Sequence, residues 1–391
     1  MAQIDNEIFD ITNIRIRVLE PVKNVLPFQD ATMGPFHTFG MAIITLEDAD
    51  GNIGEAPVFS TYINVLETCL FPILLHSANK PHKELFHSMY WSIRNEGFRG
   101  QAASLLGQID MALYDLAARR SKVPLHKYLG AEKDLVKVYG SGGGTNYNCK
   151  DLEAEVSFFL DKGVEYYKMK VGRSFGKQID VDAERVKFVQ QLIGNKCKLA
   201  IDANQIWTCD EALTFMDKVG TENIAWLEEP VHSAAYDQIQ KLCAKVPVPV
   251  SYGESERSAK TFPILSQLGV KHFQPVPTQM SGIKEWMDVR DLAAEKGLMF
   301  SSGGYSFFTA FLLATANDNA MLENLRCIME GLEEYLLVMP EWEQNGCMRL
   351  PDIEGLPVRV DWEYCTRKNK IIKCFAWSRQ TVKPYSAFVT L

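Results

Sequence analysis

Short β-rich runs alternate with amphipathic helical segments through the middle of this chain, and no other feature of the sequence constrains the fold as strongly. The step from one run to the next averages roughly 26 residues, which accommodates one short strand, one helix and two loops. Residues 151–163 illustrate the helical part, with apolar side chains such as Leu152 and Val156 on one face and Gly163 as a stop. The eight runs are residues 136–140, 166–171, 198–202, 224–228, 248–252, 270–276, 298–302 and 319–322. Eight strand–helix units in about 200 residues predict a (β/α)8 barrel.

A doubly wound open sheet is the alternative architecture for alternating strands and helices. The dinucleotide-binding form of that sheet carries GxGxxG after its first strand, and this pattern is missing here. The glycine-rich residues 140–144 lack the GK[ST] ending of a phosphate-binding loop, so a flexible loop after the first strand explains them better. The barrel is therefore the favoured prediction.

The two ends of the chain have a different character. Residues 14–56 contain three β-rich runs, the last two separated by a turn signal, which predicts an antiparallel meander. Residues 101–120 place apolar side chains at helical spacing. The last 50 residues return to strand-like and irregular sequence, and we expect them to pack against the N-terminal region.

The composition, with 47% hydrophobic and 23% charged residues, fits an ordinary soluble globular protein. A net charge of −8 disfavours a nucleic acid or an anionic membrane as the main partner, although a local cation or lysine cluster can still attract a small anion. No secretory signal is expected from the first residues, and no run of 18 apolar residues predicts a membrane span. Nine scattered cysteines without a CxxC pair predict reduced thiols, so a cytoplasmic protein is expected.

Three acidic residues stand at the ends of three successive predicted strands. Asp202 ends the third run, Glu228 ends the fourth and Glu254 follows the fifth, at intervals of 26 residues. In a barrel all three lie at the C-terminal face, where catalytic groups collect. Neighbouring carboxylates in a dry pocket repel one another unless a cation lies among them, and hard oxygen ligands suit Mg²⁺. The sequence therefore predicts a magnesium site.

Two lysines end the second run, at Lys168 and Lys170. Residues i and i+2 of a strand point to the same face, so both lysines enter the barrel mouth while Met169 packs outward. Two ammonium groups side by side near a divalent cation lower each other's pKa, which lets one of them be neutral near pH 7 and act as a base.

The order of these motifs resembles that of the enolase superfamily, in its mandelate racemase/muconate-lactonizing subgroup. The motifs are KxK at 168–170, DAN at 202–204, EEP at 228–230 and GE at 253–254, and residues 109–115 and 124–130 resemble the end of that family's capping domain. The resemblance covers nearly the whole chain. It implies an α/β fold: a modified TIM (β/α)7–8 barrel over residues 134–339, with an α+β capping domain over residues 1–133 that residues 340–391 complete.

The resemblance also implies a mechanism. Mg²⁺ held by the three strand-end carboxylates binds a small carboxylate substrate, and the family abstracts the proton α to that carboxylate and stabilises the enediolate on the metal. By position, Lys170 is the base, and Lys168 contacts the carboxylate and tunes Lys170. Asn204 lies near the substrate, and Glu323 matches an acidic residue that hydrogen-bonds the enediolate.

The sequence departs from the family at two strand ends. Many members carry an aspartate after strand six and a histidine after strand seven, on the opposite face of the substrate. Here Val276 takes the first position, which also excludes the lysine of the muconate-type members, and Ser302 or Gly303 takes the second. Racemisation needs acid and base on both faces, so these departures favour a β-elimination of water on one face.

Such an elimination needs an acid for the leaving hydroxide. His37 lies in the N-terminal segment that loops over the active site in this family, and Tyr305 follows the glycine pair of strand seven. Tyr252 on strand five is a third possibility. Arg257, beside the third metal ligand, could bind a distal carboxylate, although a salt bridge explains it more simply.

The first hypothesis is therefore a Mg²⁺-dependent dehydratase that converts an acid sugar with a 2,3-dihydroxy acid group into a 2-keto-3-deoxy acid. A racemase, epimerase or cycloisomerase of another carboxylate is the alternative. A metal-binding relative without turnover is the third hypothesis, supported by the missing residues but opposed by the lysine pair, which is costly to bury without a use. The subgroup also implies a homo-oligomer, a dimer or an octamer.

Overall fold

The computed structural model describes residues 3–96 and 99–385 of the 391-residue chain. Eight parallel strands form a closed barrel, because each strand pairs with the next and the last pairs back with the first. The strands are β8 (Leu135–Gly142), β9 (Tyr166–Lys170), β10 (Lys198–Asp202), β11 (Ile224–Glu228), β12 (Val250–Tyr252), β13 (His272–Phe273), β14 (Met299–Ser302) and β15 (Met321–Leu325). They coincide with the eight β-rich runs, which confirms the predicted barrel.

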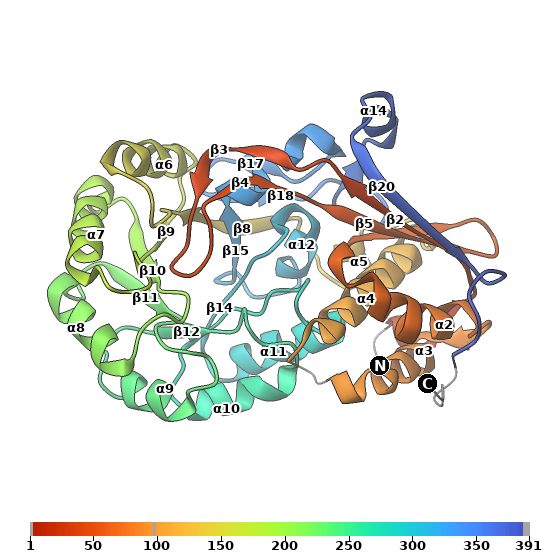
Figure 1. Ribbon diagram of the computed structural model, residues 1–391, viewed down its shortest axis with the longest axis horizontal. Coiled ribbons are helices and arrows are strands. Elements are labelled where there is room, and N and C mark those ends of the chain that lie inside the picture. Colours follow the sequence, from red (N-terminus) through yellow and green to blue (C-terminus); the bar gives the residue numbers. More distant parts are fainter. Residues whose placement is uncertain (1–2, 97–98, 386–391) are drawn as a thin grey trace.

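Helices follow the strands and cover the outside of the barrel (Figure 1). They are α6 (Cys149–Asp161), α7 (Ile179–Ile193), α8 (Cys209–Val219), α9 (Tyr236–Cys243), α10 (Phe262–Gln267), α11 (Ile283–Glu295), α12 (Ser306–Leu313) and the short α13 (Arg326–Met329). Local sequence sets their starts: the Asn148 side chain accepts hydrogen bonds from the backbone N–H groups of Lys150 and Asp151, and the Asp151 side chain accepts one from Asn148.

Large side chains fill the barrel interior below its C-terminal mouth. Tyr139, Ala200, Trp226 and Met321 form one buried cluster, in which the Tyr139 and Trp226 rings meet edge to face at 5.3 Å. This cluster fills the barrel below its C-terminal mouth, and the polar side chains of the mouth lie above it.

Both ends of the chain build a second antiparallel sheet beside the barrel. Its order is β20 (Ile371–Ser378), β2 (Ile11–Leu19), β5 (Ala42–Asp48) and β6 (Ile53–Pro57), so the predicted meander is joined by a C-terminal strand. The chain between 340 and 370 does not all return to this sheet. Strands β17 (Glu341–Glu343) and β18 (Cys347–Arg349) extend the barrel sheet instead, since β18 pairs antiparallel with β8. Further short elements are β16 (Leu336–Val338), β19 (Arg359–Val360) and α14 (Trp362–Arg367).

Helix α4 (Gln101–Arg120) connects the cap to the barrel and is buried over most of its length. The Gln108 side chain donates 2.8 Å to the Thr278 carbonyl and accepts from the Phe59 N–H at 2.9 Å. A Cβ atom on Gly107 would lie 2.0 Å from the Met280 carbonyl oxygen, so only glycine allows this approach. The smaller helices α2 (Phe71–Leu75), α3 (His82–Ser92) and α5 (Leu125–Tyr128) pack nearby. No helix in the described part of the chain has the length and hydropathy to cross a bilayer.

A hairpin of β3 (Val22–Phe28) and β4 (Phe36–Phe39) extends from the cap over the barrel mouth (Figure 1). Its tip is tied to the loop after β8. Thr145 donates from its backbone N–H to the Gln29 carbonyl at 2.7 Å and from its hydroxyl to the Asp30 carbonyl at 2.9 Å. The hairpin therefore forms one wall above the mouth.

Candidate active site

The three strand-end carboxylates come together at the C-terminal mouth of the barrel. Asp202 and Glu228 are the last residues of β10 and β11 and are neighbours in the strand register, and Glu254 follows β12 by two residues. One oxygen from each carboxylate lies within 4.8 Å of the other two. Asp202 and Glu228 are buried, and the indole N–H of Trp226 donates 2.9 Å to Glu228 Oε2, which fixes the orientation of that carboxylate.

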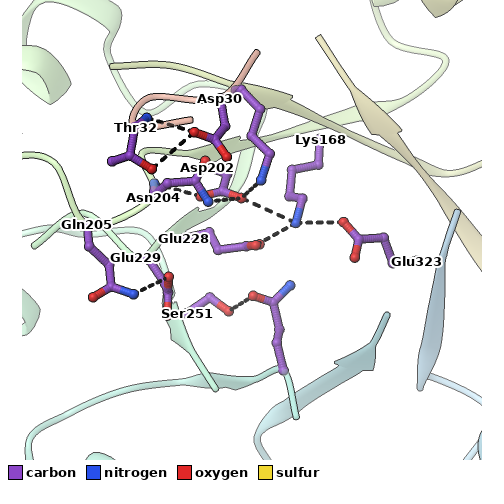
Figure 2. A network of polar contacts seen from close by, with 12 residues as sticks. Asp30, Thr32, Lys168, Asp202, Asn204, Gln205, Glu228, Glu229, Ser251 and Glu323 are labelled. Atoms are coloured by element: carbon purple, nitrogen blue, oxygen red, sulfur yellow. Dashed lines mark hydrogen bonds and ion pairs between the residues drawn. The ribbon is translucent and has the colours of Figure 1, made fainter. Parts of the chain in front are cut away.

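Lys168 and Lys170 project from the same side of β9 toward these carboxylates, as strand alternation requires. Figure 2 shows Lys168 at the centre of three carboxylates: its Nζ lies 2.5 Å from Glu228 Oε1, 2.8 Å from Glu323 Oε1 and 3.5 Å from Asp202 Oδ2. Lys170 Nζ donates to Asp202 Oδ2. The sequence motifs on strands two, three, four and eight therefore form one polar network.

A buried arginine fixes the end of the strand that carries the lysines. Arg185 Nη1 donates 3.1 Å to the Lys170 carbonyl, and Nη2 donates 3.0 Å to the Gly143 carbonyl and 2.6 Å to the Gly144 carbonyl. Asp182 holds the guanidinium at 3.1 Å. The glycine-rich stretch of the sequence is thus a loop whose carbonyls help to position β9, which the sequence did not indicate.

The lysine pKa values differ from the expectation drawn from the sequence. Burial lowers the pKa of Lys170 and Lys168 lowers it further, but the neighbouring carboxylates, with Asp202 the largest contributor, together raise it above its usual value. Burial likewise lowers the pKa of Lys168, and Glu228 and Glu323 together raise it well above its usual value. The expected repulsion between the lysines is therefore present, but the carboxylates override it.

The carboxylates carry more negative charge than the two lysines neutralise. Burial and the neighbouring Asp202 raise the pKa of Glu228 to about 8, and the same two causes raise the pKa of Glu254. Burial also acts to raise the pKa of Asp202, but Lys170 and Lys168 lower it to about 2. A divalent cation would relieve this repulsion and compete with the ammonium groups for the same oxygens. The residues present therefore fit Mg²⁺, which prefers carboxylate oxygens.

Asn204 and Glu323 flank this network. The Asn204 backbone N–H donates 2.9 Å to Asp202 Oδ1, and its buried Oδ1 receives no hydrogen bond from the described part of the chain, which leaves one oxygen beside the carboxylates without a donor. Burial raises and Lys168 lowers the pKa of Glu323, and the net shift is downward, so that carboxylate is ionised. A Cβ on Gly303 would lie 2.1 Å from Glu323 Oε2, so the glycine makes room for it.

A cavity of about 420 Å³ lies between the network and the hairpin of β3 and β4. Lys170, Asn204 and Glu254 line it from the barrel side, and aromatic residues such as Phe28 and Phe36 line it from the hairpin side. The position of Lys170 in this wall gives its ammonium group access to a bound small molecule. Lys168, in contrast, is fully enclosed by its carboxylate partners.

The two side chains that the sequence suggested as acids do not line this cavity. His37 is exposed on β4, although its neighbours Phe36 and Phe39 are part of the wall. Tyr305 donates from its hydroxyl to the Gly40 carbonyl at 3.1 Å, and burial raises its pKa to about 12. The structure thus brings the lysines, the carboxylates and the asparagine together, and it leaves these two side chains outside.

The strand ends opposite the lysines carry no ionisable side chain. Val276 follows β13, and a Cβ on Gly304 would lie 2.9 Å from Val276 Cγ1, so the two strand ends touch. Ser302 ends β14 and donates from its hydroxyl to the Pro275 carbonyl at 2.6 Å, away from any reacting group. Tyr252 is also engaged elsewhere, because its hydroxyl donates 2.8 Å to the Val231 carbonyl.

Sequence reasoning missed a second buried carboxylate in the cavity wall. Glu229 accepts from the Gln205 side-chain amide at 2.8 Å (Figure 2). It also accepts from the Ser255 hydroxyl at 3.1 Å. Burial and repulsion from Glu254 raise its pKa well above its usual value. The doubled glutamate of residues 228–230 was the only signal for it in the sequence.

Comparisons with known proteins agree with this geometry. The profile of the family described as "Enolase C-terminal domain-like" matches residues 151–364, which is more than half of the chain. The profile of the "Mandelate racemase / muconate lactonizing enzyme, N-terminal domain" matches residues 13–130.

Characterised relatives and solved structures show the same likeness. An arabinonate dehydratase of Saccharolobus solfataricus is 27% identical over 82% of this chain and 88% of its own length. A 3,6-anhydro-alpha-L-galactonate cycloisomerase of Streptomyces coelicolor is 27% identical over 85% of this chain and 92% of its own. The crystal structure of a racemase from Streptomyces coelicolor with bound magnesium matches with a TM-score of 0.83 at 24% identity, over 91% of this chain and 99% of that chain. The protein therefore belongs to the mandelate racemase/muconate lactonizing enzyme family of the enolase superfamily.

Proposed function

We propose that the protein is a Mg²⁺-dependent dehydratase that removes water from a 2,3-dihydroxy acid of the acid-sugar type and yields a 2-keto-3-deoxy acid. One observation carries the proposal. Lys170 lines the cavity beside the three strand-end carboxylates, whereas Val276 and Ser302 occupy the strand ends where a second base would stand. A base on a single face suits an elimination better than a racemisation.

Each residue of the site has a separate role in this reaction. Mg²⁺ held by Asp202, Glu228 and Glu254 would supply positive charge that offsets the charge of the substrate carboxylate and of the developing enediolate. Lys170 takes the proton from the α-carbon as a neutral amine, which requires that Asp202, the carboxylate that raises its pKa most, be engaged by the cation instead. Lys168, held by its carboxylate partners, stays cationic and keeps Glu228 and Glu323 in position at the edge of the site.

A single lysine can complete the elimination when the leaving hydroxyl is on its own side of the substrate. The α C–H bond breaks and its proton moves to the Lys170 amine. The same ammonium then gives that proton to the hydroxyl on the β-carbon, the C–O bond breaks, and water leaves. The resulting enol tautomerises to the 2-keto acid, so neither His37 nor Tyr305 is required as an acid.

A cycloisomerase is the second candidate, and the relative from Streptomyces coelicolor that shares 27% identity over 85% of this chain favours it. In that reaction the leaving oxygen would remain attached to the substrate when the ring opens, and a base on one face again suffices. A racemase is less well supported because it needs a second acid–base group opposite Lys170. A relative without turnover is opposed by the two buried lysines and their network.

The test is a panel of acid sugars and their cyclic forms, incubated with the protein and Mg²⁺ and assayed for 2-keto acid with semicarbazide. A parallel incubation in D₂O, followed by NMR, reports exchange of the α-proton. We expect a 2-keto acid from at least one open-chain acid. Exchange without net loss of substrate would instead identify a racemase, and product from cyclic substrates alone would identify a cycloisomerase.

Two variants assign the base in the same assay. Lys170→Ala should reduce product formation and α-exchange by at least about 10³-fold, because the proton acceptor is lost. Lys187→Ala on the exposed face of α7 removes the same charge far from the network and should retain activity. Activity of Lys170→Ala within a few-fold of the wild type would exclude Lys170 as the base.

A further inference from the structure

We infer that the substrate is a monocarboxylate whose distal part, beyond the reacting carbons, carries no second anionic group and packs against apolar side chains. The inference rests on the proposed function, because it assumes that the single carboxylate lies at the lysine and metal-site end of the cavity. It narrows the 2,3-dihydroxy acids of the proposed function: it excludes diacids and disfavours chains that are hydroxylated to their far end.

The charged side chains that line the cavity are the first observation behind this inference. Among the described residues that line it, Lys170 is the only cation, and it belongs to the reacting end. Glu254 also belongs to the reacting end, so Asp30 and Glu229 are the carboxyl groups of the remaining wall. A second carboxylate on the substrate would find no positive partner there and would meet the Asp30 carboxylate, which disfavours its binding.

Asp30 is fixed in the wall by its local structure rather than by a cation. Its Oδ1 accepts hydrogen bonds from the Thr32 backbone N–H at 2.7 Å and the Thr32 hydroxyl at 3.1 Å (Figure 2). It also accepts one from the Met33 backbone N–H at 2.6 Å. No salt bridge to Asp30 occurs within the described ranges 3–96 and 99–385. The negative charge at the tip of the hairpin is therefore uncompensated, and it repels a distal anion.

Apolar side chains line the distal wall beside the polar side chains of Asn24 and Thr32. They come from the hairpin and from the end of β15 with α13, and α13 packs against β3: Phe28, Met33, Phe36, Phe39, Leu325 and Ile328. A polyhydroxylated chain would lose water contacts against these residues without regaining hydrogen bonds. An alkyl chain would instead gain from the removal of apolar surface from water.

One polar side chain in this wall, that of Asn24, has a fixed orientation. Asn24 is buried and lines the cavity, and its Nδ2 donates 3.0 Å to the Phe36 carbonyl, which fixes the orientation of the amide. Its Oδ1 receives no hydrogen bond from the described part of the chain. This oxygen is an acceptor, so it offers nothing to a substrate carboxylate.

A matched set of six-carbon acids tests the inference. All members share the 2,3-dihydroxy acid group and differ at the far end: 2,3-dihydroxyhexanoate, 2,3-dihydroxyadipate, galactonate and 6-amino-2,3-dihydroxyhexanoate. Binding to the Mg²⁺-loaded protein is measured by isothermal titration calorimetry, and 2-keto acid is measured separately. We expect the alkyl-ended acid to bind at least tenfold more tightly than the diacid, and also more tightly than the hydroxylated acid; the amino-ended acid, which can pair with Asp30, should also bind more tightly than the diacid.

Two substitutions at one position of the distal wall, one charged and one neutral, form a matched pair of variants. Met33 is 58% exposed, so Met33→Arg adds a cation with little risk to folding, and Met33→Gln adds polarity of similar reach without charge. Met33→Arg should shift the ratio of the two affinities toward the diacid by at least tenfold, and Met33→Gln should leave that ratio near the wild-type value.

The outcomes separate this inference from the proposed function. Equal or tighter binding of the diacid by the wild type would overturn the inference, even if the diacid were dehydrated. Selective binding of the alkyl-ended acid without formation of a 2-keto acid from any member would uphold the inference and count against the dehydratase.

Discussion

Lys168 Nζ lies 2.8 Å from Glu323 Oε1, although the two residues belong to the second and the eighth strand of the barrel. Closure of the barrel makes this contact possible, because β15 pairs with β8 and β8 pairs with β9. The same ammonium also contacts Glu228. One buried cation is therefore shared between a residue of the proposed metal site and a residue outside it.

The first prediction concerns that shared cation. Glu323→Gln removes one of its anionic partners, which lowers the pKa of Lys168 relative to the wild type and frees the side chain to move. We expect α-proton exchange in D₂O to fall at least tenfold. Stability to urea should fall by only about 1–3 kcal/mol, because Glu228 and Asp202 remain as partners. Glu330→Gln, which breaks a salt bridge to Arg326 on α13, is the control and should retain exchange. Wild-type exchange in Glu323→Gln would remove Glu323 from the proposed machinery.

The second prediction uses the close approach of Gly303 to Glu323. A Cβ at position 303 would lie 2.1 Å from Glu323 Oε2, so Gly303→Ala must displace that side chain. We expect Gly303→Ala to destabilise the protein by about 1–3 kcal/mol, as overpacking does. In a Glu323→Ala background the same substitution should cost at least about 1 kcal/mol less, as measured by a double-mutant cycle in urea. Additive effects would mean that the two residues do not touch.

The barrel and the grouping of the acidic residues could be predicted because both depend on local patterns. A strand–helix period fixes the order of the strands, and parallel strands bring their carboxyl ends to one edge. Asp202, Glu228 and Glu254 therefore had to be neighbours once the barrel was assumed. Their role as metal ligands, like the catalytic role of Lys170, stays a prediction from the sequence and the geometry.

Features that depend on distances between segments far apart in the chain could not be predicted. The pattern of β4 gave no register against β3, so the sequence could not show that Phe36 and Phe39 line the cavity while His37 is exposed. It also gave no distance between Lys170 and Asp202, and that contact raises the pKa of Lys170 where the lysine pair alone would lower it. The balance of charges at a site depends on the distances between its side chains, and the residue types alone do not give these distances.

The third prediction concerns metal binding. Because burial and mutual repulsion raise the pKa values of Glu228 and Glu254, a cation that relieves the repulsion should stabilise the fold. Mg²⁺ at about 100 times its Kd should add about 2.7 kcal/mol to the free energy of unfolding, and EDTA should reverse the effect. Asp202→Asn should abolish the Mg²⁺-dependent increase in Tm. Asp210→Asn, at an exposed position of α8, is the matched control and should keep the Mg²⁺-dependent increase in Tm. An equal Mg²⁺ response in both variants would place the ion elsewhere.

The fourth prediction is a loss of stability in mild acid, caused by a histidine inside the barrel. His272 is fully buried, its ring lies edge to face on Trp226 at 4.7 Å, and one ring nitrogen lies 2.9 Å from the Ser301 hydroxyl. Burial, and to a lesser degree Lys168, lowers its pKa from 6.5 to about 3.

A group whose pKa is lowered by folding contributes stability above its unfolded pKa and loses it as the pH falls toward the folded pKa. For His272 the loss begins near pH 6.5 and continues toward pH 3, and it amounts to about 2 kcal/mol between pH 7 and pH 5. His272→Phe keeps the ring against Trp226 but cannot take up a proton. Its free energy of unfolding in urea should therefore fall by about 2 kcal/mol less than that of the wild type over this interval. His87→Phe, at an exposed position of α3, should show the wild-type loss. If His272→Phe and the wild type lose the same stability, proton uptake by His272 is not what destabilises the protein in acid.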